Sequence, residues 1–346
     1  LMLSSKIIKE GTLLFISTMI GNIASYFFQF FMSRKLSIED FGVFNSLMSL
    51  FIITAVPIGT LLTIIARYTS QFKAKGEYEK IHIMYKSAGS KIALIGIICV
   101  MAFIFLSGNI MTFLNLSARV PIIIVGLMLA VNFVLTLNLG VLQGLQRFWF
   151  LGVNMGLNGV IRLIMGIVFV YLGFKVNGAL GATLLAGAVV FMITIIPLRK
   201  FLLDPAKGNI INGSSYKDVF SESMPVMLTY LSFAILTNID LILVKHFFTP
   251  EDAGNYAAVA ILGRTVLYLP GAIAIAMFPM VAENHALNKN SHSLLKNALL
   301  FSAAISGIGM ALFIVIPEFI LTISMGGKYA PVSDLLRLFG IAMFPF

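Results

Sequence analysis

One helical face of this sequence carries three side chains that could bind an anion. Asn154, Asn158 and Arg162 follow one another at intervals of four residues, so they lie on the same side of a helix. An arginine inside an apolar segment faces a cavity or a partner, because contact with lipid costs several kcal/mol. We therefore predict that these residues bind an anionic substrate in a central cavity. The alternative is a structural arginine that caps backbone carbonyls or pairs across helices.

Two charged residues further along the chain support a similar argument. Arg264 lies within an apolar segment and is a second candidate for anion binding. Asp240 is the one acid well inside an apolar segment, which makes it a candidate for coupling or gating. A structural ion pair of Asp240 with Arg264, or with Lys245, is the alternative interpretation.

The first apolar segment carries a polar stripe at helical spacing. Its members are Asn22, Ser25, Tyr26, Gln29 and Ser33. Polar side chains at membrane depth face protein or water, so we predict that Asn22 and Gln29 line the same cavity. The alternative is that these side chains only hold the helices together through hydrogen bonds.

Motifs for enzymatic chemistry are absent from the sequence. It has no P-loop, no nucleophile elbow, no HExxH motif and no pair of catalytic carboxylates. His285 and His292 give only a weak metal signal, and Cys99 is the sole cysteine, so it can form no internal disulfide. We expect a protein that is not an enzyme and has no metal or cofactor, with H⁺ or Na⁺ as a candidate coupling ion.

Long apolar helices must position these side chains. Apolar residues make up 59% of the 346 residues, charged residues make up 11%, and the mean hydropathy is +0.98. A helix needs about 20 apolar residues to cross a bilayer. We predict an all-α, multi-pass membrane protein with about ten visible transmembrane helices. The predicted spans are 11–33, 42–65, 88–107, 119–139, 152–173, 178–198, 220–246, 254–281 and 297–317, and a tenth that begins near Asp334.

The basic charge follows the predicted membrane topology. The formal net charge is +10, and most of the 24 lysines and arginines fall in the connections on the side of the N-terminus. This positive-inside bias predicts a cytoplasmic N-terminus in a cell (inner or plasma) membrane. The charge therefore gives no reason to expect a nucleic-acid partner.

One segment of the sequence occurs twice. Leu36–Phe44 returns as Phe248–Tyr256, and each copy joins two apolar segments. Six predicted spans separate the copies, so both emerge on the external face and the repeats are parallel. We predict a six-helix transport lobe in residues 1–205, a cytoplasmic linker at 206–216 and a second, incomplete lobe at 217–346.

Several segments together resemble the polysaccharide flippases. In chain order they are Ser33–Gly42, Gly140–Phe148, Asn238–Asp240, Ala253–Ala258, Pro317–Glu318 and Gly326–Tyr329. These O-antigen and capsule translocases belong to the multidrug/oligosaccharidyl-lipid/polysaccharide exporter superfamily. The resemblance implies two six-helix lobes around a central cavity that work by alternating access.

The resemblance also implies a substrate and partners. The substrate would be an undecaprenyl-pyrophosphate-linked oligosaccharide, moved from the inner to the outer leaflet of the lipid bilayer. The polysaccharide polymerase machinery would be a further partner. A cationic cavity suits a pyrophosphate, and Arg162 and Arg264 fit that role.

Three other functions stay open from the sequence. A cation-coupled multidrug exporter of the same superfamily generally uses an acid in its first lobe, where this chain has Arg162 and no acid well inside a span. A lipid II flippase would use the same fold and the same lipid carrier. A membrane glycan polymerase or ligase is disfavoured by the short external loops and by the repeat.

Overall fold

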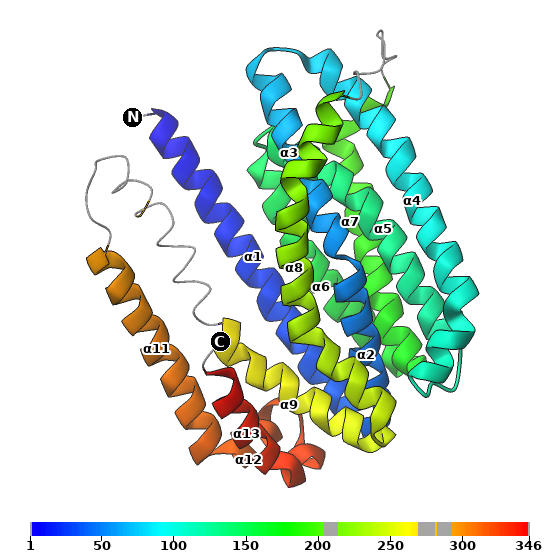
Figure 1. Ribbon diagram of the computed structural model, residues 1–346, viewed down its shortest axis with the longest axis vertical. Coiled ribbons are helices and arrows are strands. Elements are labelled where there is room, and N and C mark those ends of the chain that lie inside the picture. Colours follow the sequence, from blue (N-terminus) through cyan, green and yellow to red (C-terminus); the bar gives the residue numbers. More distant parts are fainter. Residues whose placement is uncertain (1, 204–213, 269–280, 282–291, 345–346) are drawn as a thin grey trace.

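The part of the chain that the structure describes is built from helices. The computed structural model describes residues 2–203, 214–268, 281 and 292–344 (Figure 1). In chain order the elements are α1 (Met2–Lys35), α2 (Ile38–Thr54), α3 (Val56–Ala74), α4 (Tyr78–Phe113), α5 (Val120–Gly144), α6 (Phe148–Tyr171), α7 (Lys175–Leu203), α8 (Ser214–Phe247), α9 (Pro250–Tyr268), α11 (His292–Val315), α12 (Pro317–Ser324), the 3₁₀-helix η1 (Gly327–Val332) and α13 (Ser333–Met343). The all-α prediction is confirmed.

Seven of the described helices are long and apolar enough to cross a membrane. They are α1 from Thr12 onward, α4 to α8, and α11. Helices α2 and α3 pass the same test together but meet at a bend of 41°, so the span predicted at 42–65 is a broken one. Pro57 is the second residue of α3 and has no N–H with which to continue the hydrogen-bond ladder of α2.

Two of the predicted boundaries involve residues outside the described ones. The span predicted at 254–281 is described as α9 as far as Tyr268. The linker predicted at 206–216 lies outside the described residues up to residue 213, and its last three residues belong to the first turn of α8.

Helices α1 to α7 pack together, and we term this set lobe 1 (residues 2–203). Helix α5 lies against α3, α4 and α7, while α1 packs on α6. Glycines let α1 and α6 approach at backbone distance, because a Cβ on Gly159 would lie 2.3 Å from the carbonyl oxygen of Gly21. This close packing puts Asn22 and Ser25 of the polar stripe beside α6, whereas Gln29 bonds to α2.

Helices α8 to α13 are termed lobe 2 (residues 214–344), and they follow the order of lobe 1. The offset from Lys35 to Phe247, where α1 and α8 end, equals the offset from Gly42 to Gly254 in the repeated segment. Helix α9 starts at the same offset from the start of α2. Both α8 and α9 contact α2, and α13 packs on α9 (Figure 1).

The two copies of the repeated segment meet in space. A Cβ on Gly42 would lie 2.7 Å from the backbone nitrogen of Gly254, and a Cβ on Gly254 would lie 1.9 Å from the carbonyl oxygen of Ile38. Nearby, Ser46 donates a hydrogen bond to the carbonyl of Leu241 at 3.3 Å. We term this region the lobe junction (residues 33–46, 113–118, 173–177, 241–254 and 323–329).

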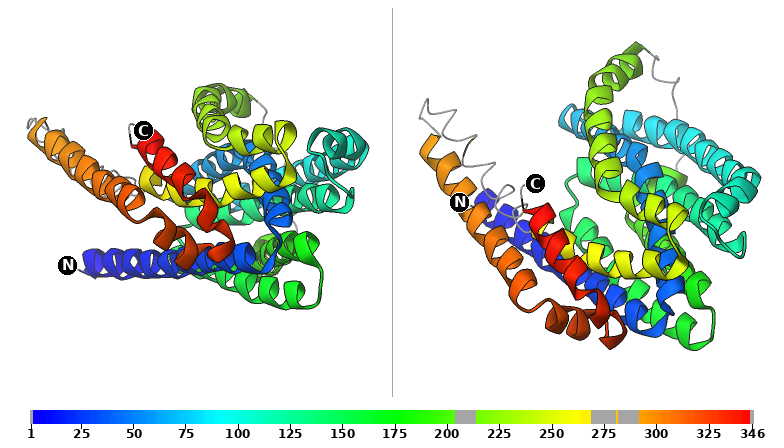
Figure 2. Two further views of the ribbon diagram at one scale, coloured as in Figure 1. Left: turned by 90° about the horizontal axis from the view of Figure 1, so that it is seen from below. Right: turned by 60° about the horizontal axis from the view of Figure 1, so that its bottom comes forward.

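The end of α1 contributes one set of junction contacts, with the segment after α12 (Figure 2). The hydroxyl of Ser33 donates to the carbonyl of Met325 at 3.0 Å, and Lys328 donates to the carbonyl of Leu36. Each lobe therefore supplies donors for carbonyls that the end of a helix in the other lobe leaves without intrahelical partners.

The end of α8 contributes a second set, with the end of α4. Asn115 donates to the carbonyl of His246 at 3.1 Å, and the His246 ring stacks on Phe113 with centroids 4.0 Å apart. At the offset of the repeat, His246 corresponds to Arg34 and Met325 corresponds to Phe113. The end of α8 therefore contacts the end of α4 in lobe 1 just as the end of α1 contacts the end of α12 in lobe 2.

Candidate functional site

The asparagines predicted to bind substrate line one cavity in lobe 1. This cavity of about 250 Å³ lies between α1, α5, α6 and α7. Asn22, Asn154 and Asn158 line it together with Thr18 and Ser25 of α1. The structure therefore brings together three of the residues that the sequence singled out.

Arg162 lies one helical turn beyond Asn158, outside the lining of this cavity. Its guanidinium carbon is 5.1 Å from the centroid of the Phe28 ring, a cation–π contact between α6 and α1. The guanidinium forms no hydrogen bond or ion pair with any described residue, and its buried Nε has no acceptor. Leaving a buried donor unpaired costs about 1–3 kcal/mol, so an anion placed here would recover that energy.

Gln29 lies next to Phe28 and contacts α2 instead of the cavity. Its Nε2 donates to Oδ1 of Asn45 at 3.4 Å. Its Oε1 is buried and has no donor among the described residues. The unpaired Oε1 of Gln29 therefore lies next in sequence to Phe28, the residue whose ring the unpaired guanidinium of Arg162 contacts.

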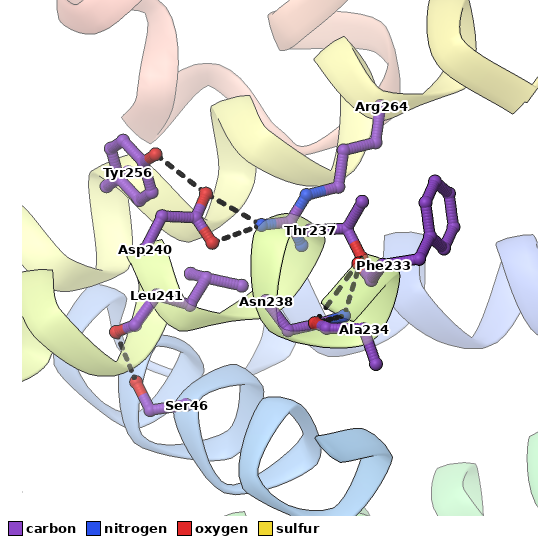
Figure 3. Close-up of polar contacts among 9 residues, drawn as sticks. All are labelled: Ser46, Phe233, Ala234, Thr237, Asn238, Asp240, Leu241, Tyr256 and Arg264. Carbon is purple, nitrogen blue, oxygen red and sulfur yellow. Dashed lines mark hydrogen bonds and ion pairs between the residues drawn. The ribbon is translucent and has the colours of Figure 1, made fainter. Parts of the chain in front are cut away.

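The predicted charged residues of lobe 2 pair with each other (Figure 3). One guanidinium nitrogen of Arg264 lies 2.6 and 2.7 Å from the two carboxylate oxygens of Asp240. The hydroxyl of Tyr256 donates to the same carboxylate at 2.8 Å. Of the two partners that the sequence left open for Asp240, the structure has Arg264 and not Lys245.

Both lobes have a side-chain contact between their first two helices, with different chemistry. At the offset of the repeat, Asp240 and Tyr256 correspond to Phe28 and Phe44, whose rings lie 5.9 Å apart. Lobe 1 thus has two aromatic rings at this place, with the amides of Gln29 and Asn45 one residue later, beside a cation with no acid partner among the described residues. Lobe 2 has a cation that its own acid neutralises.

Sequence reasoning did not include Tyr256 or Asn45 in the site. Tyr256 lies eight residues before Arg264, two helical turns on the same face, and this spacing could have indicated that both reach Asp240. Asn45 carries no comparable signal. Among the described residues, which exclude His285, no three His, Cys, Asp or Glu side chains gather in a way that could hold a metal ion.

Comparison with known sequences shows the family of the chain and a distant relative. The family model described as "Polysaccharide biosynthesis protein" matches residues 7–285. An uncharacterized membrane protein of Methanocaldococcus jannaschii is 23% identical over 318 residues, which cover 86% of this chain and 73% of the relative.

Solved structures with this fold include multidrug transporters. The MATE multidrug transporter DinF-BH aligns with a TM-score of 0.65 at 18% identity, covering 96% of this chain and 81% of that one. An inward-facing MATE family transporter of the MOP superfamily aligns with a TM-score of 0.66 at 15% identity, covering 94% and 79%. A MOP superfamily transporter from Pyrococcus furiosus, whose binding pocket has reverse polarity, aligns with a TM-score of 0.51 at 16% identity, covering 97% and 80%.

Proposed function

The chain belongs to the polysaccharide biosynthesis protein family and has the fold of MOP superfamily transporters, and from this premise we propose that it is a flippase for a lipid-linked oligosaccharide. The proposed substrate is an undecaprenyl-pyrophosphate-linked unit of O-antigen, capsule or exopolysaccharide. The protein moves it from the inner to the outer leaflet of the cell membrane by alternating access between the lobes.

The observation that supports this proposal is the lack of an acid partner for Arg162 among the described residues. A half-buried guanidinium without an acid partner among the described residues is suited to the pyrophosphate, because arginine forms paired, charge-assisted hydrogen bonds with phosphate oxygens. Asn22, Asn154 and Asn158 lie next to it along α1 and α6. Amides both donate and accept hydrogen bonds, as sugar hydroxyls do, so this cavity suits the first sugars after the pyrophosphate.

The same charge argues against a cationic drug as substrate. A cation entering the lobe 1 cavity would come within about one helical turn of Arg162, and no described acid lines that cavity to compensate. A pyrophosphate would instead gain from that charge. The absence of an acid among the described cavity residues therefore favours a glycan carrier over a cationic drug.

Asp240 is the proposed coupling residue, with H⁺ or Na⁺ as the ion. Its carboxylate holds Arg264 and Tyr256, which belong to the next helix. Protonation or Na⁺ binding at Asp240 would weaken that hold and release Arg264 for the substrate. The polysaccharide polymerase machinery would receive the flipped unit on the outer face.

The test is restoration of surface glycan in a strain that lacks its own polysaccharide flippase, with the full-length gene at matched expression. We expect the wild type to restore glycan, Arg162→Ala to lower it at least tenfold, and Arg162→Lys to retain part of it. Arg119→Ala, which removes an exposed arginine, is the matched control and should behave as the wild type.

Two results would change the assignment. Full restoration by Arg162→Ala would remove Arg162 from the substrate site while keeping the function. Failure of the wild type in glycan strains, together with growth rescue of a strain depleted of its lipid II flippase, would assign the protein to peptidoglycan precursors.

A further inference from the structure

A second cavity lies at the lobe junction, lined by residues other than those proposed to bind the glycan. Its volume is about 400 Å³, within the range of about 300–1,000 Å³ for small-molecule sites. The starts of α2, α5, α7 and α9 line it, and the last turn of α8 contributes Lys245. Lys245 and Pro250 come from lobe 2 and the remaining lining residues from lobe 1, so the cavity requires both lobes.

Lys245 is an unusual residue for the wall of a cavity. Its side chain is only 1% exposed, yet it forms no hydrogen bond or ion pair with a described residue. Glu39 attracts it electrostatically without forming an ion pair. A buried charge without a partner is costly, so an anionic group in the cavity would replace the hydration that the ammonium group has lost.

Other donors extend this anion-binding part of the cavity. Lys175 adds a second ammonium group and is the first residue of α7. Helix α5 also starts at the cavity, with Pro121 among the lining residues. The first N–H groups of α7 have no intrahelical acceptors and favour anions, whereas Pro121 of α5 has no N–H and Ile122 donates to the carbonyl of Arg119.

The same cavity presents acceptors that have no partner. Glu39 and Asp40 of the first turn of α2 line it. Asn177 also lines it, and its buried Oδ1 receives no hydrogen bond from a described residue. No ion pair among the described residues joins these acids to Lys175 or Lys245, so the charges do not neutralise one another by contact.

We propose that the junction cavity binds a zwitterion that carries a phosphate ester and an ammonium group. The phosphate binds Lys245 and Lys175, and the ammonium group binds Glu39 and Asp40. The unpaired oxygen of Asn177 accepts a further hydrogen bond from the ligand. A simple anion would face both carboxylates and a simple cation both ammonium groups, whereas a zwitterion satisfies both sets.

Phosphoethanolamine has this chemistry, either as a free molecule or as the headgroup of a phospholipid in the outer leaflet. The predicted topology places the junction at the external face, where such headgroups lie. The inference does not depend on which substrate the protein transports, because it concerns binding at a separate cavity.

Isothermal titration calorimetry on the full-length protein in detergent tests the site with O-phosphoethanolamine, inorganic phosphate and ethanolamine as probes. We expect O-phosphoethanolamine to bind at least tenfold more tightly than either fragment. Lys245→Met should weaken this binding at least tenfold, because it removes a charge-assisted contact. Lys75→Met, at an exposed lysine between α3 and α4, is the matched control and should leave the affinity unchanged.

Glu39→Gln keeps the proposal testable if Lys245→Met does not fold, because Glu39 is exposed. This variant should lose the preference for O-phosphoethanolamine over phosphate. The same titration with O-phosphoethanolamine in nanodiscs distinguishes the two sources. Loss of the signal in phosphatidylethanolamine nanodiscs but not in phosphatidylglycerol nanodiscs would identify the lipid headgroup as the ligand. A signal in both kinds of nanodisc would identify the free molecule. Equal binding of phosphate and O-phosphoethanolamine by the wild type, or wild-type affinity and preference in Glu39→Gln, would overturn the proposal.

Discussion

At the scale of single residues, Arg162 and Arg264 are the same side chain in two electrostatic environments. Arg264 is 9% exposed and is held by Asp240 at 2.6 Å. Arg162 contacts the Phe28 ring and no described acid. In the proposed function, Arg162 is therefore available to an anion as it stands, whereas Arg264 becomes available only after its pair with Asp240 opens.

We predict that the protein loses stability when one partner of the Asp240–Arg264 ion pair is replaced. Asp240→Asn leaves a nearly buried guanidinium without its counter-charge, and we expect about 2 kcal/mol or more of destabilisation. Asp240 keeps 28% side-chain exposure, so the effect should fall below that of a fully buried pair. Thermal unfolding of the purified protein measures it. The double variant Asp240→Leu with Arg264→Leu should recover most of the loss, and no recovery would contradict this account.

A new acid beside Arg162 should stabilise the protein and stop its transport. Asn158→Asp places a carboxylate one helical turn before Arg162, where it can pair with the guanidinium. We expect a higher unfolding temperature together with at least a tenfold loss of surface glycan in the complementation assay. Asn158→Ser is the uncharged control and should retain most activity, and equal activity of the two variants would show that Arg162 does not bind the substrate.

At the scale of helices, the approach of α2 and α9 depends on two glycines. A side chain at Gly254 would meet the carbonyl oxygen of Ile38 at 1.9 Å, and backbone atoms cannot rotate away as a side chain can. We expect Gly254→Ala to keep α2 and α9 apart and to abolish transport. Cysteines placed at junction positions measure the separation, because a thiol reagent should label them faster when α2 and α9 are held apart.

Gly59 provides the matched control for this prediction. It lies inside α3, and a Cβ added there would meet nothing within 4 Å. Gly59→Ala should keep the transport activity and stabilise the protein by about 0.5–1 kcal/mol, because alanine is the better helix former. Unimpaired transport by Gly254→Ala would show that the close contact is dispensable.

The helices and their order could be predicted from sequence because apolar length and helical spacing are local properties. They predict that Asn22, Asn154 and Asn158 lie on polar faces, and the structure puts all three in one cavity. Spacing does not tell which helix faces which, so the partner of Asp240 stayed open between Arg264 and Lys245. The junction cavity could not be predicted at all, because residues far apart in the chain build it.

At the scale of the whole molecule, the lobes meet at the junction, and α3 also packs on α8 outside it. A cross-link across it should stop the alternation between inward and outward access that we propose. Arg34→Cys with Ile323→Cys, in a Cys99→Ser background, places thiols at two exposed positions on opposite lobes whose side chain and backbone are in contact. A short bifunctional methanethiosulfonate reagent should abolish glycan flipping, and a reducing agent should restore it.

The matched control is a cross-link inside lobe 1. Lys73 donates to Gln146 at 2.8 Å, and cysteines at these two positions join α3 to the loop after α5. The same reagent should leave transport intact there, since alternating access as we propose it moves lobe 1 as a unit. Inhibition of both pairs alike would indicate that the reagent acts on something other than the junction.

The contact of Gly42 with Gly254 brings a sequence segment against its own copy. A homodimer with two-fold symmetry produces contacts of this kind, in which one surface patch is its own partner and every substitution acts twice. In the fused chain the two patches can change separately, so one glycine can vary while the other compensates. The two copies of the segment thus form surfaces that can vary independently, and the Asp240–Tyr256 contact of lobe 2, where lobe 1 has Phe28 and Phe44, is the kind of divergence that this allows.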